Sequence, residues 1–179
     1  DWTANPVPID QALLNELPAL RARSREQVLN NDYARRFIKM VQTNVVGSRG
    51  MTLQAQVRDD DGSLDRRVND AVESQWRDWC KAKNCDNTKT RNWVALQQLA
   101  VHSVMQDGEA VVLIHNDKTN MNLEIVDPEL LPVQHNRRLD NGNYIRMSIE
   151  FNSNRQPIAY HILDNSKSDL SYGYPGLRY

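Results

Sequence analysis

The chain has 179 residues, of which 40% are apolar and 25% charged, and its formal net charge is −1. These values describe an ordinary globular segment that is long enough to bury a core, and the charge argues against a dedicated nucleic-acid binder, which is usually strongly basic. The sequence contains no apolar run of bilayer-spanning length and no signal peptide. We therefore expect one soluble domain over residues 1–179. Both ends read as interrupted, so we expect a larger intact protein.

The first part of the chain, about 1–108, shows the apolar spacing of helices. A helix is predicted from Asp10 to about Leu29, with a kink or split at Pro18. A second helix is predicted from an N-cap at Asp32 to about Val46. The residues that its spacing places on one face are Tyr33, Phe37, Met40, Val41 and Asn44.

Two further helices and one strand complete this helical part. Residues 50–57 alternate apolar and polar side chains, which predicts a half-buried strand. Residues 64–82 predict a helix with a wide apolar stripe (Leu64, Val68, Val72, Trp76 and Trp79), followed by a loop over 84–88. The last helix is predicted from a cap at Thr90 to Gly108.

The second part, about 109–163, is predicted to be rich in strands. Residues 109–115 form an apolar run that is typical of a strand buried on both faces, and residues 122–126 predict a second strand. Asn141-Gly142 indicates a hairpin, with further strands over 144–151 and 157–163. A loop tail is predicted over 164–179. The expected fold is α+β, with N-terminal helices packed on a small, mostly antiparallel sheet.

Neither a metal site nor an active site is indicated by the sequence. Cys80 and Cys85 are too far apart for a zinc knuckle, no second pair follows, and the four histidines are scattered. Nucleophile elbows, phosphate-binding glycine loops and HExxH motifs are missing. Asp107-Gly108-Glu109 has the composition of a turn. We expect reduced cysteines, no cofactor and no enzyme activity, although an active site completed by sequence elsewhere stays open as an alternative.

Residues 20–50 carry seven basic side chains against two acidic ones. Arg21 and Arg25 are four residues apart and would share a helix face. The cluster is compatible with a solvated helix face, with a subunit contact, or with sequence-independent DNA binding. The residues chosen as candidate interface positions are Arg21, Arg25, Arg35, Arg36 and Lys39. Trp76 and Trp79 could stack on bases, but their helical spacing favours core packing.

Several blocks of sequence, in order, resemble the lambda-type phage portal proteins. They are residues 21–26 (RARSRE), 30–36 (NNDYARR), 44–47 (NVVG), 76–79 (WRDW) with Cys85-Asp86, 100–110 (AVHSVMQDGEA), 123–131 (LEIVDPELL), 149–151 (IEF) and 157–163 (PIAYHIL). They span roughly residues 2–163. The chain departs from the family before Pro157, where relatives often have a glycine and this chain has Asn154-Arg155-Gln156. Asn tolerates left-handed backbone, so the hairpin is still expected.

The resemblance implies a homo-oligomeric ring, typically dodecameric, at one capsid vertex. Such a ring nucleates head assembly, binds the packaging terminase, passes double-stranded DNA through its axis and holds the head–tail connector proteins. This segment would correspond to the outer wing of the subunit, with the channel-lining parts after Tyr179. The implied location is the virion, assembled in the host cytoplasm, with capsid or scaffold proteins as further partners and no membrane. A sequence-independent DNA-binding domain is the alternative.

Overall fold

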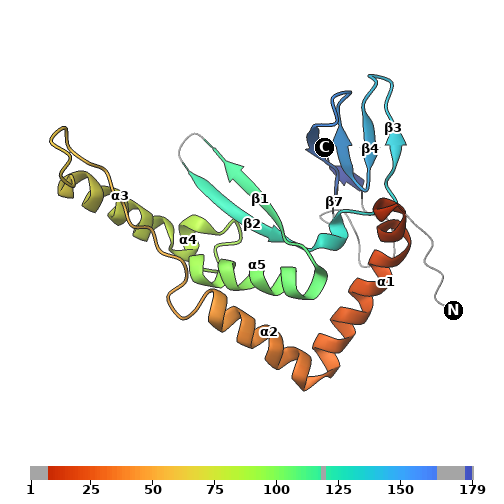
Figure 1. Cartoon of the computed structure of the whole chain (residues 1–179), viewed down its shortest axis with the longest axis horizontal. Coiled ribbons are helices and arrows are strands. Elements are labelled where there is room, and N and C mark those ends of the chain that lie inside the picture. Colours follow the sequence, from red (N-terminus) through yellow and green to blue (C-terminus); the bar gives the residue numbers. More distant parts are fainter. Residues whose placement is uncertain (1–7, 118–119, 165–175, 179) are drawn as a thin grey trace. The chain divides into compact units, whose positions relative to one another are not determined.

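The computed structural model describes residues 8–117, 120–164 and 176–178. Its helices are α1 (Ile9–Asn30), α2 (Asp32–Val45), α3 (Arg66–Trp79), α4 (Ala82–Cys85) and α5 (Trp93–Asp107), with a 3-10 helix η1 (Pro128–Leu130). Its strands are β1 (Val111–Asn116), β2 (Met121–Val126), β3 (Arg137–Arg138), β4 (Tyr144–Arg146), β5 (Ile149–Phe151), β6 (Pro157–Tyr160), β7 (Ile162–Asp164) and β8 (Gly176–Arg178) (Figure 1). Helices come first and small antiparallel sheets follow, which confirms the predicted α+β class.

The chain forms two compact units, which we call the helical unit and the sheet unit. The helical unit is Gln27–Val126, and the sheet unit combines Asp1–Glu26 with Asp127–Tyr179. Helix α1 begins in the sheet unit and ends in the helical unit, and it runs through Pro18 without a split. The single domain expected over residues 1–179 stays a prediction.

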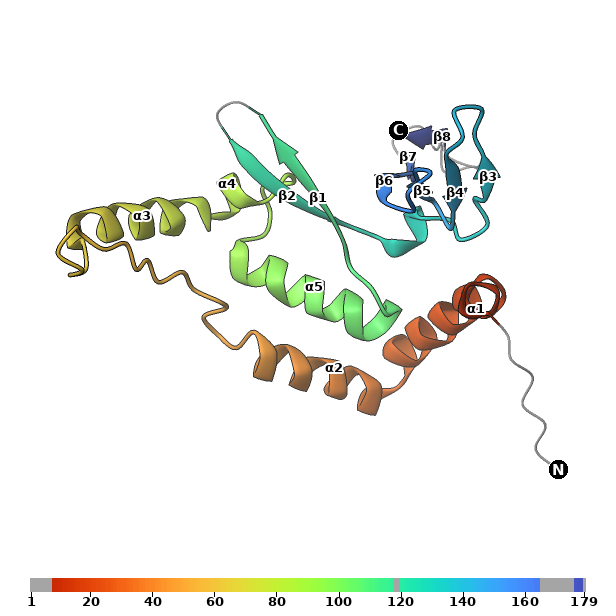
Figure 2. The ribbon, with the colours of Figure 1, turned by 45° about the horizontal axis from the view of Figure 1, so that its top comes forward.

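In the helical unit, α5 lies between α2 and the β1–β2 hairpin in both views (Figures 1 and 2). The side of α2 that carries the buried Ile38 packs on α5, and the Gln42 side chain donates a hydrogen bond to the Gln98 carbonyl oxygen at 2.8 Å. Leu96 of α5 is buried in the same core. The side chain of Gln98 in turn donates a hydrogen bond from Nε2 to the Gly47 carbonyl oxygen. Polar groups that lose water on folding usually keep a hydrogen-bond partner in this way.

The helix starts differ slightly from the prediction. Asn31, not Asp32, caps α2, because Asn31 has extended backbone and its Oδ1 accepts hydrogen bonds from the amides of Tyr33 and Ala34. Likewise Asn92, not Thr90, caps α5 through the amide of Ala95. The predicted closing residues of α2 and α5, glycines 47 and 108, stand where expected.

The predicted strand over 50–57 is wrong. This segment has no partner strand among the described residues, and side chains of two helices bind its backbone instead. The hydrogen bonds run from Met51 N to Gln97 Oε1 (2.7 Å), from Ala55 N to Glu73 Oε1 (3.1 Å) and from Val57 N to Asn69 Oδ1 (2.8 Å), while Asn69 Nδ2 donates to the Val57 oxygen (3.0 Å). The alternation indicates extended backbone, but a sheet also needs a second strand.

The loop after α4 is organised by the buried carboxylate of Asp86. It accepts hydrogen bonds of 2.6 to 3.3 Å from the amides of Thr88, Thr90 and Arg91 and from both threonine hydroxyls. Burial alone would raise the pKa of Asp86, but these hydrogen bonds outweigh it and lower the pKa to about 2. The next residue, Asn87, donates its amide to the Leu123 oxygen, so the loop is joined to β2. The observed loop therefore starts two residues later than the predicted loop over 84–88, because α4 continues to Cys85.

The predicted strands at 109–115 and 122–126 are confirmed as β1 and β2, which pair antiparallel with Val111 opposite Val126. The expectation that the first strand is buried on both faces is wrong. Ile114 is 66% exposed, and Val112 is also exposed. A two-stranded ribbon covered by α4 and α5 has one side left in solvent.

In the sheet unit, β3, β4, β5 and β6 form one antiparallel sheet in that order. The Asn141-Gly142 hairpin is confirmed, with the Gly142 amide bonded to the Leu139 oxygen. The predicted strand over 144–151 is interrupted, because Met147 and Ser148 both have left-handed backbone. Ser148 is fully buried, and its hydroxyl donates to the Pro132 oxygen at 2.8 Å.

Two details near the C-terminal end differ from expectation. The left-handed residue in the turn before Pro157 is Arg155 (φ 61°), whereas the sequence favoured an asparagine for this conformation. The predicted strand over 157–163 is divided into β6 and β7 at His161, and β8 pairs antiparallel with β7. The loop tail predicted over 164–179 is therefore wrong at Asp164 and at Gly176–Arg178, which are strand residues, and its remaining residues lie outside the described part of the chain.

We call residues 50–57, whose backbone is bound by side chains of α3 and α5, the side-chain-bound segment. A glycine substitution tests how closely this segment approaches α5. At Gly50 (φ +68°) an added Cβ would lie 2.8 Å from Gln97 Nε2 and 3.1 Å from Val94 Cγ2. We expect Gly50→Ala to lower the free energy of unfolding by about 2 to 4 kcal/mol, from backbone strain plus the clash. Gly62→Ala is the matched control, because Gly62 has φ +83° with nothing within 4 Å, and we expect about 1 kcal/mol. Equal losses in chemical denaturation would contradict the close approach.

Acid titration tests the Asp86 hydrogen bonds. Because the folded pKa of about 2 lies below the ordinary 3.8, the carboxylate stabilises the fold fully above about pH 4, and this stabilisation is lost as the pH falls toward 2. We expect Asp86→Asn to lower the free energy of unfolding at pH 7 by about 2 kcal/mol and to remove this part of the acid dependence. Asp60→Asn, at an exposed position, should leave both unchanged.

Candidate functional site

The five candidate cations lie on two helices. Arg21 and Arg25 belong to the part of α1 in the sheet unit, whereas Arg35, Arg36 and Lys39 belong to α2 in the helical unit. Arg21 is buried, Arg25 is partly buried, and the three α2 residues are exposed. The sequence cluster therefore divides into two groups with different surroundings.

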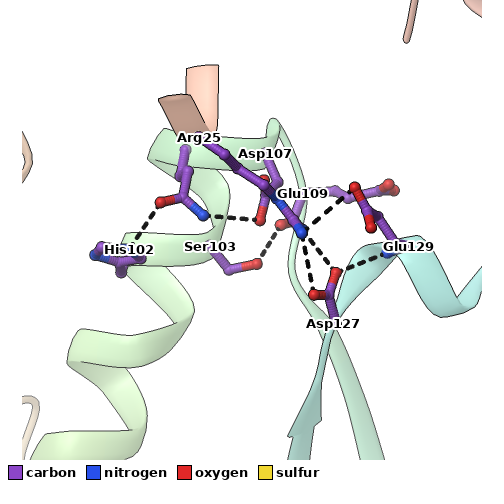
Figure 3. A network of polar contacts seen from close by, with 8 residues as sticks. Arg25, His102, Ser103, Asp107, Glu109, Asp127 and Glu129 are labelled. Atoms are coloured by element: carbon purple, nitrogen blue, oxygen red, sulfur yellow. Dashed lines mark hydrogen bonds and ion pairs between the residues drawn. The ribbon is translucent and has the colours of Figure 1, made fainter. Parts of the chain in front are cut away.

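Arg25 binds two acidic side chains of its own chain (Figure 3). Its Nη2 and Nη1 donate to the two carboxylate oxygens of Asp127 at 2.6 and 3.1 Å, and Nη1 lies 3.4 Å from Glu129 Oε1. The hydrogen bond from Arg25 lowers the pKa of Asp127, burial opposes this, and the charge of Arg21 adds to the lowering. A bidentate pair of this kind fixes geometry as well as charge. The contact of Arg21 and Arg25 with another subunit stays a prediction.

The cations of α2 are directed to solvent. Arg35 pairs with Asp32 in the first turn of the helix, an exposed ion pair that contributes little stability. Arg36 and Lys39 are exposed. Their predicted role at an interface stays a prediction, and the structure leaves them accessible for it.

An apolar stripe lies on the exposed side of α2. We call Tyr33, Phe37 and Met40 the α2 stripe; their spacing of four and three residues places them on one helix face. They are 87%, 49% and 52% exposed, respectively, while Ile38 and Val46, on the opposite side, are buried. The sequence grouped the stripe residues on one face, but it did not show that this face is exposed. Large apolar side chains grouped in solvent mark interaction sites more often than scattered ones do.

A second exposed apolar surface lies where the side-chain-bound segment runs along α3. We call it the α3 surface, and its members are Met51, Leu53 and Val57 of the segment with Leu64, Val68 and Val72 of α3 and its approach. Their exposed fractions range from 38% to 58%. The predicted apolar stripe on this helix is thus largely in solvent at its N-terminal end. The hydrogen bonds of Asn69 and Glu73 hold the two parts of this surface together.

Three tryptophans cluster at the C-terminal end of α3. Trp76 and Trp79 stack at 5.0 Å between ring centroids, and Trp93 contacts them at 5.7 and 5.4 Å. The indole N–H groups of Trp79 and Trp93 donate to the oxygens of Met121 and Met51. The tryptophans pack on one another, as their spacing predicted, and this mutual packing argues against a base-stacking platform. The rings are half-buried, and a pocket of about 300 Å³ opens beside Trp76 and Trp93. Its other lining residues are both apolar and charged: Arg49, Met51, Thr52, Leu53, Glu73, Arg77, Cys80 and Val94.

A cluster of two histidines and a glutamate lies in the sheet unit, which sequence reasoning missed because its members are up to 26 residues apart. His161 Nε2 lies 3.0 Å from Glu150 Oε2, and the rings of His135 and His161 are 5.3 Å apart. Burial and the nearby His161 lower the pKa of His135. The buried Ser148 donates its hydroxyl to a backbone oxygen and not to an imidazole, so the nucleophile–base pairing of an acyl-transfer site is not formed here.

The other residues tested for chemistry have structural surroundings. Cys80 and Cys85 are free thiols, and burial raises the pKa of both. Within residues 8–117, 120–164 and 176–178, no three His, Cys, Asp or Glu side chains gather as metal ligands would. The Asp107-Gly108-Glu109 sequence forms the predicted turn after α5, where the Ser103 hydroxyl donates to the Glu109 oxygen (Figure 3). None of the described helices combines the length and apolar character needed to cross a membrane.

Comparison with known proteins identifies the class to which this fold and these surfaces belong. The family described as phage portal protein, lambda family, matches residues 1–177. The chain therefore belongs to the lambda family of phage portal proteins, and this family is structural and not catalytic. The resemblance seen in the sequence is confirmed.

One relative is the probable portal protein of Halomonas phage phiHAP-1. It is 32% identical to this chain over 173 residues, which are 94% of this chain and 33% of that protein. The chain thus spans about a third of the length of this relative.

Proposed function

We propose that this chain is part of the subunit of a portal ring at a capsid vertex. The ring forms the conduit through which DNA is packaged and ejected, and it carries the head–tail connection. The observation that carries this proposal is the family match over residues 1–177. In this role the described segment supplies the outer wing of the subunit and contacts between subunits, and the channel lining is supplied by other parts of the subunit.

Two exposed apolar surfaces in one unit support a role in assembly. The α2 stripe and the α3 surface together place nine large apolar side chains in solvent. A ring with closed cyclic symmetry joins two different faces of each subunit, so each subunit needs two such surfaces. The partners proposed for the ring are a terminase, capsid or scaffold proteins and head–tail connector proteins, with a typical copy number of twelve.

Charge reversal on α2 tests the proposal in the full-length protein. We expect the wild-type protein to give ring particles in native mass measurement and electron microscopy. Arg35→Glu with Arg36→Glu should reduce the ring fraction at least tenfold, because both cations are exposed at the proposed contact. Arg23→Glu, on α1, is the control and should leave the rings intact. A wild-type protein that stays monomeric at high concentration would refute the proposed function.

The alternative is sequence-independent DNA binding by the exposed cations of α2. Arg35, Arg36 and Lys39 occupy one exposed helix, which is the observation in its favour. If it holds, affinity for duplex DNA should fall steeply with salt, with a slope set by the number of phosphates contacted, and Lys39→Gln should reduce that slope by about one unit. A titration of the chain without measurable affinity at low salt would exclude this alternative.

A further inference from the structure

The β3–β4 hairpin of the sheet unit, whose two strands lie side by side in Figure 1, carries an open pocket that the proposed function does not use. The pocket has a volume of about 830 Å³, and its described lining comes from residues between 136 and 146, together with Ser153. Three of the lining residues are arginines, Arg137, Arg138 and Arg146, and none of the described lining residues is acidic. We call this site the arginine pocket.

The acidic side chains near the pocket balance only part of its charge. Residues 136–156 contain four arginines and two acidic residues, Asp140 and Glu150. Asp140 is exposed in the hairpin turn, and Glu150 is hydrogen-bonded to two other side chains of the sheet unit. In the part of the chain that the structure describes, neither Arg137 nor Arg138 forms an ion pair with a carboxylate. Both are exposed, so both guanidinium groups are accessible to an anion from solution.

Arg146 is held in place at the pocket by two contacts. Its Nη1 donates a hydrogen bond to Asp10 Oδ2 at 2.6 Å, and its guanidinium lies 5.9 Å from the centroid of the Tyr144 ring. The bond to Asp10 uses one of the five N–H donors of the guanidinium, so Arg146 keeps donors for a ligand. Because Asp10 offsets one of the three positive charges, two remain at the pocket.

The lining fits a ligand that is recognised through charge and hydrogen bonds. All of its cations are arginines, and the planar guanidinium matches two oxygens of a phosphate group. A peptide partner would need an exposed apolar anchor position, but Leu139 is partly buried and Ile145 is buried. The ring of Tyr144 stacks on Phe151 at 5.4 Å between centroids, so it is already used and does not serve as a platform for unpaired bases.

We infer that the arginine pocket binds the phosphodiester backbone of a nucleic-acid duplex. Arg137 and Arg138 are the principal contacts, and Arg146 supplies a third. Contacts with phosphates alone position a protein on a duplex without reading its sequence. The site is in the sheet unit, so it is distinct from the exposed cations of α2, and it does not depend on ring assembly. Charges on an edge strand such as β3 also prevent pairing with another sheet, and the binding experiment separates these two roles.

Fluorescence anisotropy of a short labelled DNA duplex, titrated with the chain at low salt, tests the inference. We expect Arg137→Gln with Arg138→Gln to weaken binding about tenfold or more and to lower the slope of log affinity against log salt by about two units, because two phosphate contacts are lost. The matched control is Arg35→Gln with Arg36→Gln on α2, which removes the same charge elsewhere and should leave the slope unchanged. All of these arginines are exposed, so both variants should keep the wild-type circular dichroism spectrum and thermal midpoint.

The opposite change in charge should strengthen binding. Asp10→Asn removes the carboxylate that offsets Arg146, and an exposed ion pair contributes little stability, so we expect the fold to be kept. Affinity for the duplex should rise about twofold to threefold at low salt, and the gain should disappear at high salt. Asp60→Asn, an exposed position in the helical unit, is the control and should leave the affinity unchanged. An unfolded variant would not bind more tightly, so unchanged or weaker binding by Asp10→Asn would overturn the inference.

Competition identifies the class of ligand. Unlabelled duplex should displace the labelled duplex, whereas polyglutamate at the same concentration of negative charge should not. Equal displacement by polyglutamate would assign the pocket to an acidic protein segment and overturn the inference. A wild-type chain that does not bind the duplex, or a loss of affinity in the α2 double variant alone, would overturn it as well. Because none of these measurements involves rings, assembly of the full-length protein stays a separate test of the proposed function.

Discussion

The helical unit depends on an extended segment whose backbone is bound by side chains. Gln97 of α5 binds one end of it, at Met51, and Asn69 and Glu73 of α3 bind the other. A sheet would satisfy such a segment by pairing it with a strand, and would bury one of its faces. Here amide and carboxylate groups satisfy the backbone while its apolar side chains stay largely in solvent. This arrangement joins α2 to α3, brings the segment beside α3, and creates the α3 surface.

The same arrangement explains why exposed apolar surface is concentrated in one unit. The core of the helical unit is small, and the buried side of α2 is used up by its contact with α5, so the stripe on the other side has no partner among the described residues. Two exposed apolar surfaces, the α2 stripe and the α3 surface, are then available on one unit. If the protein assembles as proposed, these surfaces are where its contacts with other subunits are expected.

Much of the fold could be predicted from the sequence, because the local spacing of apolar residues indicates helices and strands. Four of the helices (α1, α2, α3 and α5), the β1–β2 pair and the Asn141-Gly142 hairpin follow from spacing and turns, whereas the short helix α4 was not predicted. The errors arise where tertiary partners decide. Residues 50–57 have a strand's alternation but no second strand, and the Tyr33–Phe37–Met40 stripe has a core-like pattern on a face that the core does not reach. The cations were found from composition, yet only the structure shows that Arg25 is bound to Asp127 within its own chain.

The division of the sheet unit into two chain segments has a consequence for biosynthesis. Arg25 and Asp127 are 102 residues apart in sequence and meet within that unit, so about a hundred residues of helical unit must leave the ribosome before the ion pair can form. Long-range closures of this kind slow folding, whereas the helical unit is one uninterrupted stretch and is free to fold first. The helical unit is therefore inserted in the sequence of the sheet unit. A genetic deletion that joins residue 26 to residue 127 through a short linker would reveal whether the sheet unit folds without the helical unit.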